Sequence, residues 1–370
     1  MAREPILLTP GPTPVPPEVR EVMSRPIPHH RTTEFQAILK EAAAGLKTVF
    51  RTQQEVLIFT SSGTGAMEAA VVNLLSPGDT VFVIQGGKFG ERWTEICKAY
   101  RISVVEFNTP WGRPLDLNQV KQEIAKNPAI KVIFSTLCET STGVAYDIRG
   151  LRQAIGPKPL LVVDAISGLC ADFFEMDAWG VDVTVSGSQK GLMLPPGLAF
   201  IALSARAWEA VEHSTSGRYY LDLRLAREAW KDTDTPFTPG ISLIIGLAES
   251  LKTIQKRGLD QVLAKNRSLA EAVRQAVKAL GLELYTDSAC ASNGVTSVKV
   301  PAGIDGKELL KRLRKEEGIV LAGGQGKELA GKIFRIATMG AIGPEEIRAG
   351  LTALEKVLGL MGWKAPSVHV

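Results

Sequence analysis

The sequence predicts an α/β protein with a seven-stranded, mostly parallel, doubly wound sheet and a smaller C-terminal α+β unit. Two observations carry this prediction. Short apolar runs alternate with longer amphipathic stretches between residues 18 and about 255, and that alternation ends near residue 257. A chain of 370 residues is long enough for two or three domains. We therefore expect an N-terminal arm over 1–17, a large domain over 18–256 and a small domain over 257–370.

Seven apolar runs supply the strands of the large sheet. Each is five to seven residues long, and most are rich in Val, Ile or Phe, which is typical of strands buried on both faces. Most of the stretches between them are long enough for helices, so the strands should run largely parallel. The runs are Val56–Thr60, Thr80–Ile84, Ile102–Phe107, Ile130–Thr136, Leu160–Asp164, Asp182–Ser186 and Leu198–Leu203.

The two ends of the chain follow other patterns. Residues 1–17 hold six prolines, which fix φ and lack an N–H, so this segment should be extended rather than a helix or an inner strand. It could be a loose tail or an arm that lies across a partner subunit. The small unit should contain a helix over 258–280, strands at 295–300 and 333–336, and helices near 305–317 and 344–361.

Composition excludes several classes of function. The net charge is only +4, and no basic stripe is interleaved with aromatic residues, so we expect no nucleic-acid partner. No apolar run approaches the roughly 20 residues of a membrane span, and the proline-rich start does not resemble a signal peptide. The four cysteines stand far apart without a C-x-x-C pair, and the four histidines form no metal motif. We expect a cytoplasmic protein with no metal site.

Ligands of open parallel sheets bind at the carboxyl ends of the strands, and a glycine-rich loop follows the first run there. It reads Ser61-Ser62-Gly63-Thr64-Gly65-Ala66 and opens an apolar helical pattern. Free N–H groups at the start of a helix favour an anion such as phosphate. Because Glu68 stands where a third glycine would be, the loop matches neither nucleotide-binding motif. A plain strand-to-helix turn remains the alternative.

Two charged residues follow later strands at the same edge. Asp164 ends a buried run and needs a cationic partner, but no Arg or Lys lies within four residues of it. Lys190 follows in Gly187-Ser188-Gln189-Lys190-Gly191, where it could be a general base, a Schiff-base nucleophile or a surface residue. A phosphate-binding loop, a buried acidic residue and a lysine are together the groups that a protein needs to bind pyridoxal phosphate.

The order of these motifs resembles the class V aminotransferases of fold type I, over nearly the whole chain. Within that family the sequence is most similar to the alanine–glyoxylate and serine–glyoxylate branch, and it also resembles proteins described as the small subunit of a soluble hydrogenase. The segments that carry the resemblance are Leu8–Pro14, Gly63–Ala66, Glu139–Gly143, Val163–Ala165, Ser186–Gly191, Pro195–Gly197 and Tyr220–Leu223.

This resemblance implies a homodimer that uses pyridoxal 5′-phosphate. Lys190 would bond the cofactor aldehyde and then move protons, and Asp164 would pair with the pyridinium nitrogen. The remaining contacts to the cofactor ring and phosphate would come from Thr64, Gly65, Ala66, Phe89, Thr140, Gln189 and, reaching the neighbouring subunit, Thr238.

The resemblance also implies the substrates, a small L-amino acid (alanine or serine) and a 2-oxo acid (glyoxylate or pyruvate). Arg335 would hold their α-carboxylate, and Gly11 would line the pocket from the arm. A cysteine desulfurase of the same class is one alternative, although that family stacks a histidine where this chain has Phe89, and Cys290 lacks an obvious activator. An accessory subunit of a hydrogenase complex is the other.

Overall fold

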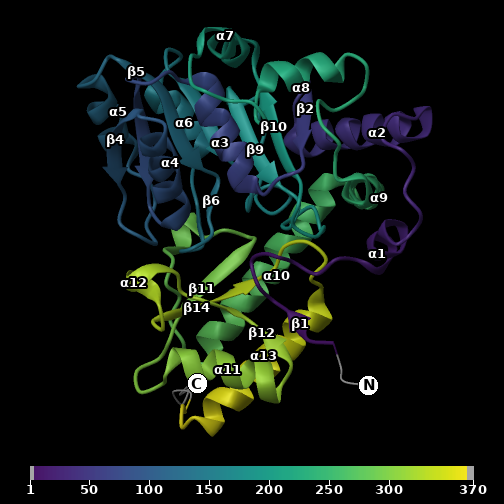
Figure 1. Cartoon of the computed structure of the whole chain (residues 1–370). Helices are drawn as coiled ribbons and strands as arrows, with labels where there is room; N and C mark the ends of the chain where they lie inside the picture. The colour runs from purple at the N-terminus through teal and green to yellow at the C-terminus, as the bar shows by residue number, and fades with distance from the viewer. Residues whose placement is uncertain (1–3, 365–370) are drawn as a thin grey trace.

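The computed structural model describes residues 4–364 and has a seven-stranded sheet at its centre (Figure 1). The strand order is β2-β10-β9-β8-β5-β3-β4. The strands are β2 (Val56–Phe59), β3 (Thr80–Gln85), β4 (Ser103–Asn108), β5 (Ile130–Thr136), β8 (Leu160–Asp164), β9 (Val183–Gly187) and β10 (Ala199–Leu203). All seven predicted runs are strands of this sheet, so the predicted α/β fold class is confirmed.

One strand departs from the parallel arrangement. β10 runs antiparallel to both of its neighbours, β2 and β9, whereas the other pairings are parallel. The segment between β9 and β10 contains no helix, and a tight return of this kind joins antiparallel strands because a parallel return needs a longer crossover. Because β2 and β9 are both antiparallel to β10, they run parallel to each other. Their carboxyl ends therefore lie at the same edge of the sheet.

Side chains alternate between two cores, one on each face of the sheet. Along β3, Phe82 and Ile84 join one core, and Val81 and Val83 join the other. The first face is covered by α2 (Thr33–Phe50), α5 (Leu117–Ala125), α6 (Ile148–Ile155) and α9 (Ile241–Arg257). The second is covered by α3 (Gly63–Leu74), α4 (Lys88–Ala99), α7 (Ala205–His213) and α8 (Leu223–Trp230).

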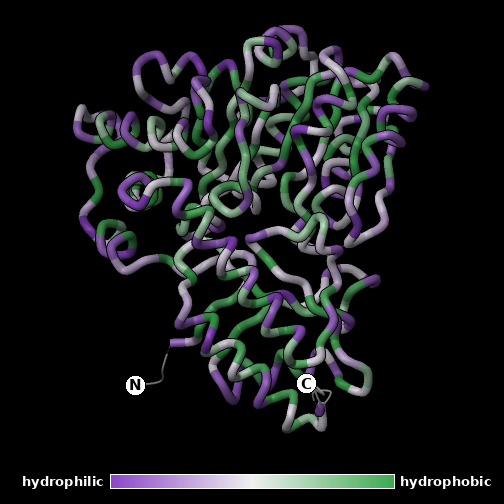
Figure 2. The backbone as a smooth tube through the Cα atoms, turned by 180° about the vertical axis from the view of Figure 1, so that it is seen from behind, coloured by the Kyte–Doolittle hydropathy of each residue, from purple (hydrophilic) through white to green (hydrophobic). Residues whose placement is uncertain are grey.

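The C-terminal elements build a second, smaller core below the large sheet in Figure 1. Its three-stranded antiparallel sheet has the order β11-β14-β13. The elements are α10 (Leu259–Ala279), β11 (Val295–Lys299), α11 (Gly306–Glu316), β12 (Ile319–Val320), β13 (Ala322–Gly323), α12 (Gly326–Leu329), β14 (Ile333–Ala337) and α13 (Pro344–Leu360). Figure 2 shows hydrophobic stretches through the interior of both regions and hydrophilic stretches on many outer helices and loops.

The described part of the N-terminal segment, from Glu4 onward, is extended, but it is not a loose tail. β1 (Ile6–Leu7) pairs parallel with β12, and Leu8 is buried in the smaller core. This short stretch lies between Pro5 and Pro10, so its N–H groups are free to donate: Ile6 N donates to Gly318 O at 2.8 Å and Leu8 N donates to Val320 O at 2.9 Å. Helix α1 (Pro17–Met23) begins where the extended segment ends.

Candidate active site

Glycines bring the loops after β2, β8 and β9 together at one edge of the sheet. A Cβ on Gly63 would lie 2.5 Å from Ile166 Cδ1, and a Cβ on Gly187 would lie 3.4 Å from the backbone of Gly63. A side chain at Gly63 would have to displace the end of Ile166. The start of α3 therefore packs directly against the loops that carry Asp164 and Lys190.

The start of α3 presents unpaired polar groups. Among the described residues, the N–H groups of Gly63 and Thr64 have no acceptor, and the Ser62 side chain caps neither. The side-chain oxygen of Gln189 is buried there without a partner. Free donors at the positive end of a 12-residue helix form a binding site for an anion.

Asp164 ends β8 and is 3% exposed. Its Oδ1 accepts a hydrogen bond from Ile166 N at 2.8 Å, and within residues 4–364 no Lys, Arg or His comes within ion-pair distance. Burial raises the pKa of Asp164 to about 7, and the Ile166 N–H opposes that rise. A protonated ring nitrogen is the kind of partner that this carboxylate lacks.

Lys190 follows β9 and lies beneath the N-terminal segment. Its Nζ donates to Pro10 O, while Thr13 Oγ1 donates to Lys190 O at 2.8 Å and Thr13 N donates to Gln189 O at 3.1 Å. Burial lowers the pKa of Lys190 to about 8. An amine with a lowered pKa is more often neutral near neutral pH, which a nucleophile or base requires.

Gly11 packs against this lysine. Its φ is +132°, and a Cβ built on it would lie 2.4 Å from both Lys190 Cε and Nζ. The position therefore requires glycine for its backbone conformation and for the space that Lys190 occupies.

Phe89 is held by a buried carboxylate. The N–H groups of Phe89 and Gly90, in the first turn of α4, donate to Glu139 Oε2 at 3.0 and 2.9 Å. Ser141 Oγ donates to the other oxygen, Oε1, at 2.5 Å. Burial raises the pKa of Glu139, and these hydrogen bonds oppose the rise. The carboxylate thus fixes the start of α4 and the backbone position of Phe89.

Thr140 and Arg335 meet between the two cores. Arg335, on β14, donates through Nη1 to Thr140 O at 2.8 Å and through Nη2 to Gly323 O at 2.7 Å. The guanidinium is 4% exposed and has no carboxylate at ion-pair distance among the described residues. Burial lowers its pKa to about 10, so the group remains charged at neutral pH. An oriented buried cation of this kind suits a substrate carboxylate. The Thr140 and Ser167 hydroxyls lie 2.5 Å apart beside it.

Comparison with known proteins identifies the family. The model of the class V aminotransferases matches residues 7–354. The chain belongs to the class V aminotransferases. It is a transaminase, and its cofactor is pyridoxal 5′-phosphate, which the unpaired groups of α3, Asp164 and Lys190 fit.

The relatives of this aminotransferase carry several names. It is 42% identical to a "soluble hydrogenase, small subunit" of Synechococcus sp., over 97% of this chain and 94% of that protein. It is 36% identical to an L-aspartate–glyoxylate aminotransferase of Paracoccus denitrificans, over 98% and 92%. A solved structure of an alanine–glyoxylate aminotransferase from Nostoc sp. superposes with a TM-score of 0.91 at 30% identity, covering 97% of this chain and 96% of that one.

Three further predicted residues lie on the elements around this site. The Gly65 N–H donates to Ser62 O at 2.8 Å, and the Ala66 side chain is buried in the core beneath α3. Thr238 is exposed on the loop before α9, where it makes no side-chain hydrogen bond within the described chain. That loop adjoins the end of β2, because Gly240 N donates to Thr60 Oγ1 at 2.7 Å.

Sequence reasoning missed Arg92, and it did not place Ser167 beside Thr140. Arg92 lies one turn after Phe89 on α4, and its Nη1 donates to Thr64 Oγ1 at 3.3 Å. A helical i, i+3 relation to Phe89 was the available signal. Ser167 contacts Thr140 from the loop after β8. Arg218 donates to backbone carbonyls, those of Val72 and Ser216 among them.

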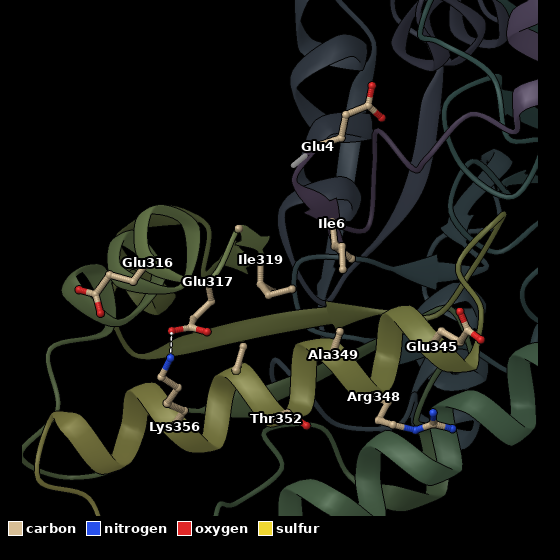
Figure 3. Close-up of a pocket in the computed structure, with 12 residues that line it drawn as sticks. Glu4, Ile6, Glu316, Glu317, Ile319, Glu345, Arg348, Ala349, Thr352 and Lys356 are labelled. Atoms are coloured by element: carbon tan, nitrogen blue, oxygen red, sulfur yellow. Dashed lines mark ion pairs between the residues drawn. The ribbon is translucent and has the colours of Figure 1, made fainter. Parts of the chain in front are cut away.

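A separate cavity of about 750 Å³ lies where β1, β12 and α13 meet. Figure 3 shows Glu4, Glu345 and Arg348 around it, and the ion pair between Lys356 and Glu317 (2.7 Å) on one side. None of the predicted site residues lines this cavity. Within residues 4–364 there is no cluster of three or more His, Cys, Asp or Glu side chains that could hold a metal. Over the same residues, none of the helices combines the length and the hydropathy of a membrane span.

Proposed function

We propose that this aminotransferase transfers the amino group of alanine or serine to glyoxylate or pyruvate. The observation that carries the proposal is the proximity of three buried groups, Lys190, Asp164 and Arg335, none of which has a charged partner at ion-pair distance among residues 4–364. They come from two strand ends of the large sheet and from β14 of the smaller one. Amino-group transfer needs three functions. Lys190 would move a proton, the Asp164 carboxylate would pair with the cofactor ring nitrogen, and the Arg335 guanidinium would bind the substrate carboxylate.

Lys190 moves the proton in this proposal. Lys190 would hold the cofactor aldehyde, and its Nζ, once released, would move the proton of the substrate α-carbon as general base and acid. The Pro10 carbonyl keeps Nζ within the pocket, and burial keeps its pKa near the working range. When bound, pyridoxal phosphate supplies the electron sink for this chemistry. Asp164, at the end of β8, would pair with the ring nitrogen and favour its protonated form.

Arg335 binds the α-carboxylate of both substrates in turn. Thr140 O and Gly323 O fix its orientation, so that the fork meets a carboxylate with little further ordering. No second cation is available from Arg218, and Arg31 is an exposed residue 3.9 Å from Asp234. Arg92 contacts Thr64 at the start of α3, where an anion of the cofactor would bind. A dicarboxylate would therefore bury an unpaired charge, which costs several kcal/mol. This favours small monoanionic substrates.

The cysteine desulfurase alternative receives no support from Cys290. This thiol is 7% exposed and lies in the short 3₁₀ turn Ser288–Cys290. Burial raises its pKa to about 11, so it is not an activated thiolate. An accessory role in a hydrogenase complex would not require the arrangement of Lys190, Asp164 and Arg335.

A donor and acceptor panel with the purified enzyme tests the substrates. The ratio of kcat/KM for alanine or serine over aspartate or glutamate should be at least about tenfold, or roughly 1.4 kcal/mol of discrimination. If aspartate with 2-oxoglutarate is the better pair, the assignment of small monoanionic substrates is wrong. Activity confined to release of sulfur from cysteine would favour the desulfurase instead.

We also propose that the active unit is a cytoplasmic homodimer, in which Thr238 contributes to the cofactor phosphate of the other subunit. Thr238 is exposed beside an aromatic cluster: the Phe237 ring lies 5.5 Å from Tyr219, which is 74% exposed, and 5.2 Å from Tyr220. Such a surface suits a second copy of the chain. The four free, buried cysteines suit a reducing compartment.

Sedimentation at working concentration tests the dimer, and a fully active monomer would contradict it. We retain the arm (1–17), large domain (18–256) and small domain (257–370) as the proposed division of the chain. Limited proteolysis that cuts near residue 257, and releases two separately folded fragments, would support the last boundary.

A further inference from the structure

Arg92 is a cation without a carboxylate partner in the cofactor site. It lies on α4 and is half-buried, and among the described residues no Asp or Glu comes within ion-pair distance of its guanidinium. Its one recorded hydrogen bond is from Nη1 to Thr64 Oγ1. Arginines that leave the solvent completely are almost always paired. Arg152, which is also half-buried, reaches Asp182 at 2.7 Å.

The contact with Thr64 places this charge at the start of α3. Thr64 is the second residue of that helix, and its N–H has no acceptor in the described chain. The positive charge of Arg92 is also close enough to lower the pKa values of both Asp164 and Lys190. The guanidinium therefore lies among the groups that surround the cofactor, on the side where α3 begins.

A phosphate monoester needs more charge than α3 can supply. The helix dipole contributes about half an elementary charge, whereas the bound phosphate carries close to two negative charges. Of the other nearby cations, Lys190 is committed to the aldehyde and Arg335 to the substrate carboxylate. Arg92 is the described cation that remains next to the free N–H groups of the helix.

We propose that Arg92 is a phosphate-binding residue of the cofactor site, donating to the phosphate beside Thr64 and the first turn of α3. The inference rests on pyridoxal phosphate being the cofactor and is independent of the choice of amino donor and acceptor. Its competitor is a purely structural role, because the Arg92 Cζ lies 4.8 Å from the centroid of the Phe89 ring and could simply support that ring.

Two aldehydes separate these roles. Pyridoxal 5′-phosphate and pyridoxal have the same ring and aldehyde, but only the first has the phosphate. Both would be titrated into the full-length enzyme after removal of its cofactor, with the absorbance of the lysine-bound form as the readout. The variants are Arg92→Gln and, as a matched control on the same helix, Lys98→Gln, because Lys98 is an exposed residue paired with Glu106 at 2.6 Å.

We expect Arg92→Gln to raise the Kd for pyridoxal phosphate at least tenfold, about 1.4 kcal/mol, and to change the Kd for pyridoxal less than twofold. Lys98→Gln should change neither. Inorganic phosphate should compete with pyridoxal phosphate in the parent and compete less well in Arg92→Gln. Equal losses for both aldehydes would overturn the proposal in favour of support for Phe89, and so would unchanged affinity for both.

A second variant keeps the test decisive if Arg92→Gln does not fold. Arg92→Lys retains the charge and the aliphatic stem but loses the planar fork. Its Kd for pyridoxal phosphate should rise severalfold while its Kd for pyridoxal stays unchanged. If Arg92→Lys weakens both aldehydes equally, the phosphate contact is refuted. Because binding is measured without amino acid or 2-oxo acid, a wrong substrate assignment would leave these results unaffected.

Discussion

Replacing Arg335 gives the sharpest test of the proposed chemistry. In Arg335→Ala the substrate carboxylate loses two charge-assisted hydrogen bonds, each worth about 1.5–3 kcal/mol. Together they predict a loss of about 3–6 kcal/mol in kcat/KM, or roughly 10²- to 10⁴-fold. Arg335→Lys retains the charge without the fork, so its loss should be smaller, about 10- to 100-fold.

The assay follows both half-reactions separately, each with its own substrate. Since donor and acceptor carboxylates use one site in turn, the KM values for both should rise in Arg335→Ala. Arg312→Ala serves as the control, because Arg312 pairs with Glu316 on the surface of α11, at 2.8 Å. A variant in which only the donor KM changes, or in which kcat/KM falls less than fivefold, would refute the shared carboxylate site.

The remaining predictions concern Lys190, Gly11 and Asp164. Borohydride reduction should leave cofactor covalently attached to the parent chain but not to Lys190→Ala, and equal retention by both would contradict the assignment. Gly11→Ala should lose most of its activity, because the new methyl group meets Lys190 Cε and Nζ at 2.4 Å; a fully active variant would show that this packing is unimportant. The pKa of Asp164 is about 7 in the folded protein, against an ordinary value of 3.8. Between these pH values the folded, cofactor-free enzyme binds one more proton than the unfolded chain does. Its free energy of unfolding should therefore fall, by at most about 4 kcal/mol, as the pH rises from 4 to 7. Thermal melts of cofactor-free Asp164→Asn should lack this slope, and an unchanged slope would assign it to another group.

Most of the fold could be predicted from the sequence because its strands are nearly continuous apolar runs. Val183–Gly187 and Ala199–Leu203 are fully buried, and short runs of this kind between turn residues are typical of strands buried on both faces. β1 and β13 are only two residues long, and each exists through its partner rather than through its own composition. The hydrophobic pattern of two residues cannot reveal which distant strand they pair with.

The residues of the candidate site also differ in whether local sequence or a tertiary contact reveals them. Asp164 and Lys190 follow strand ends, so sequence order alone placed them at one edge of the sheet. Arg92 escaped notice because its relevance depends on how α4 packs beside α3, which is a tertiary contact. The structure of a single chain cannot test the proposed role of Thr238, because that role requires a second subunit.

The pairing of β1 with β12 also bears on when the enzyme becomes complete during synthesis. Ile6 leaves the ribosome early, but its partner Ile319 lies more than 300 residues later. The large sheet, with Asp164 and Lys190 in place, can form while the arm still has nothing to pair with. Pro10 and Gly11, which cover the lysine, can therefore settle only after the C-terminal strands emerge. A nascent chain would hold an open, solvated lysine until its last elements close over it.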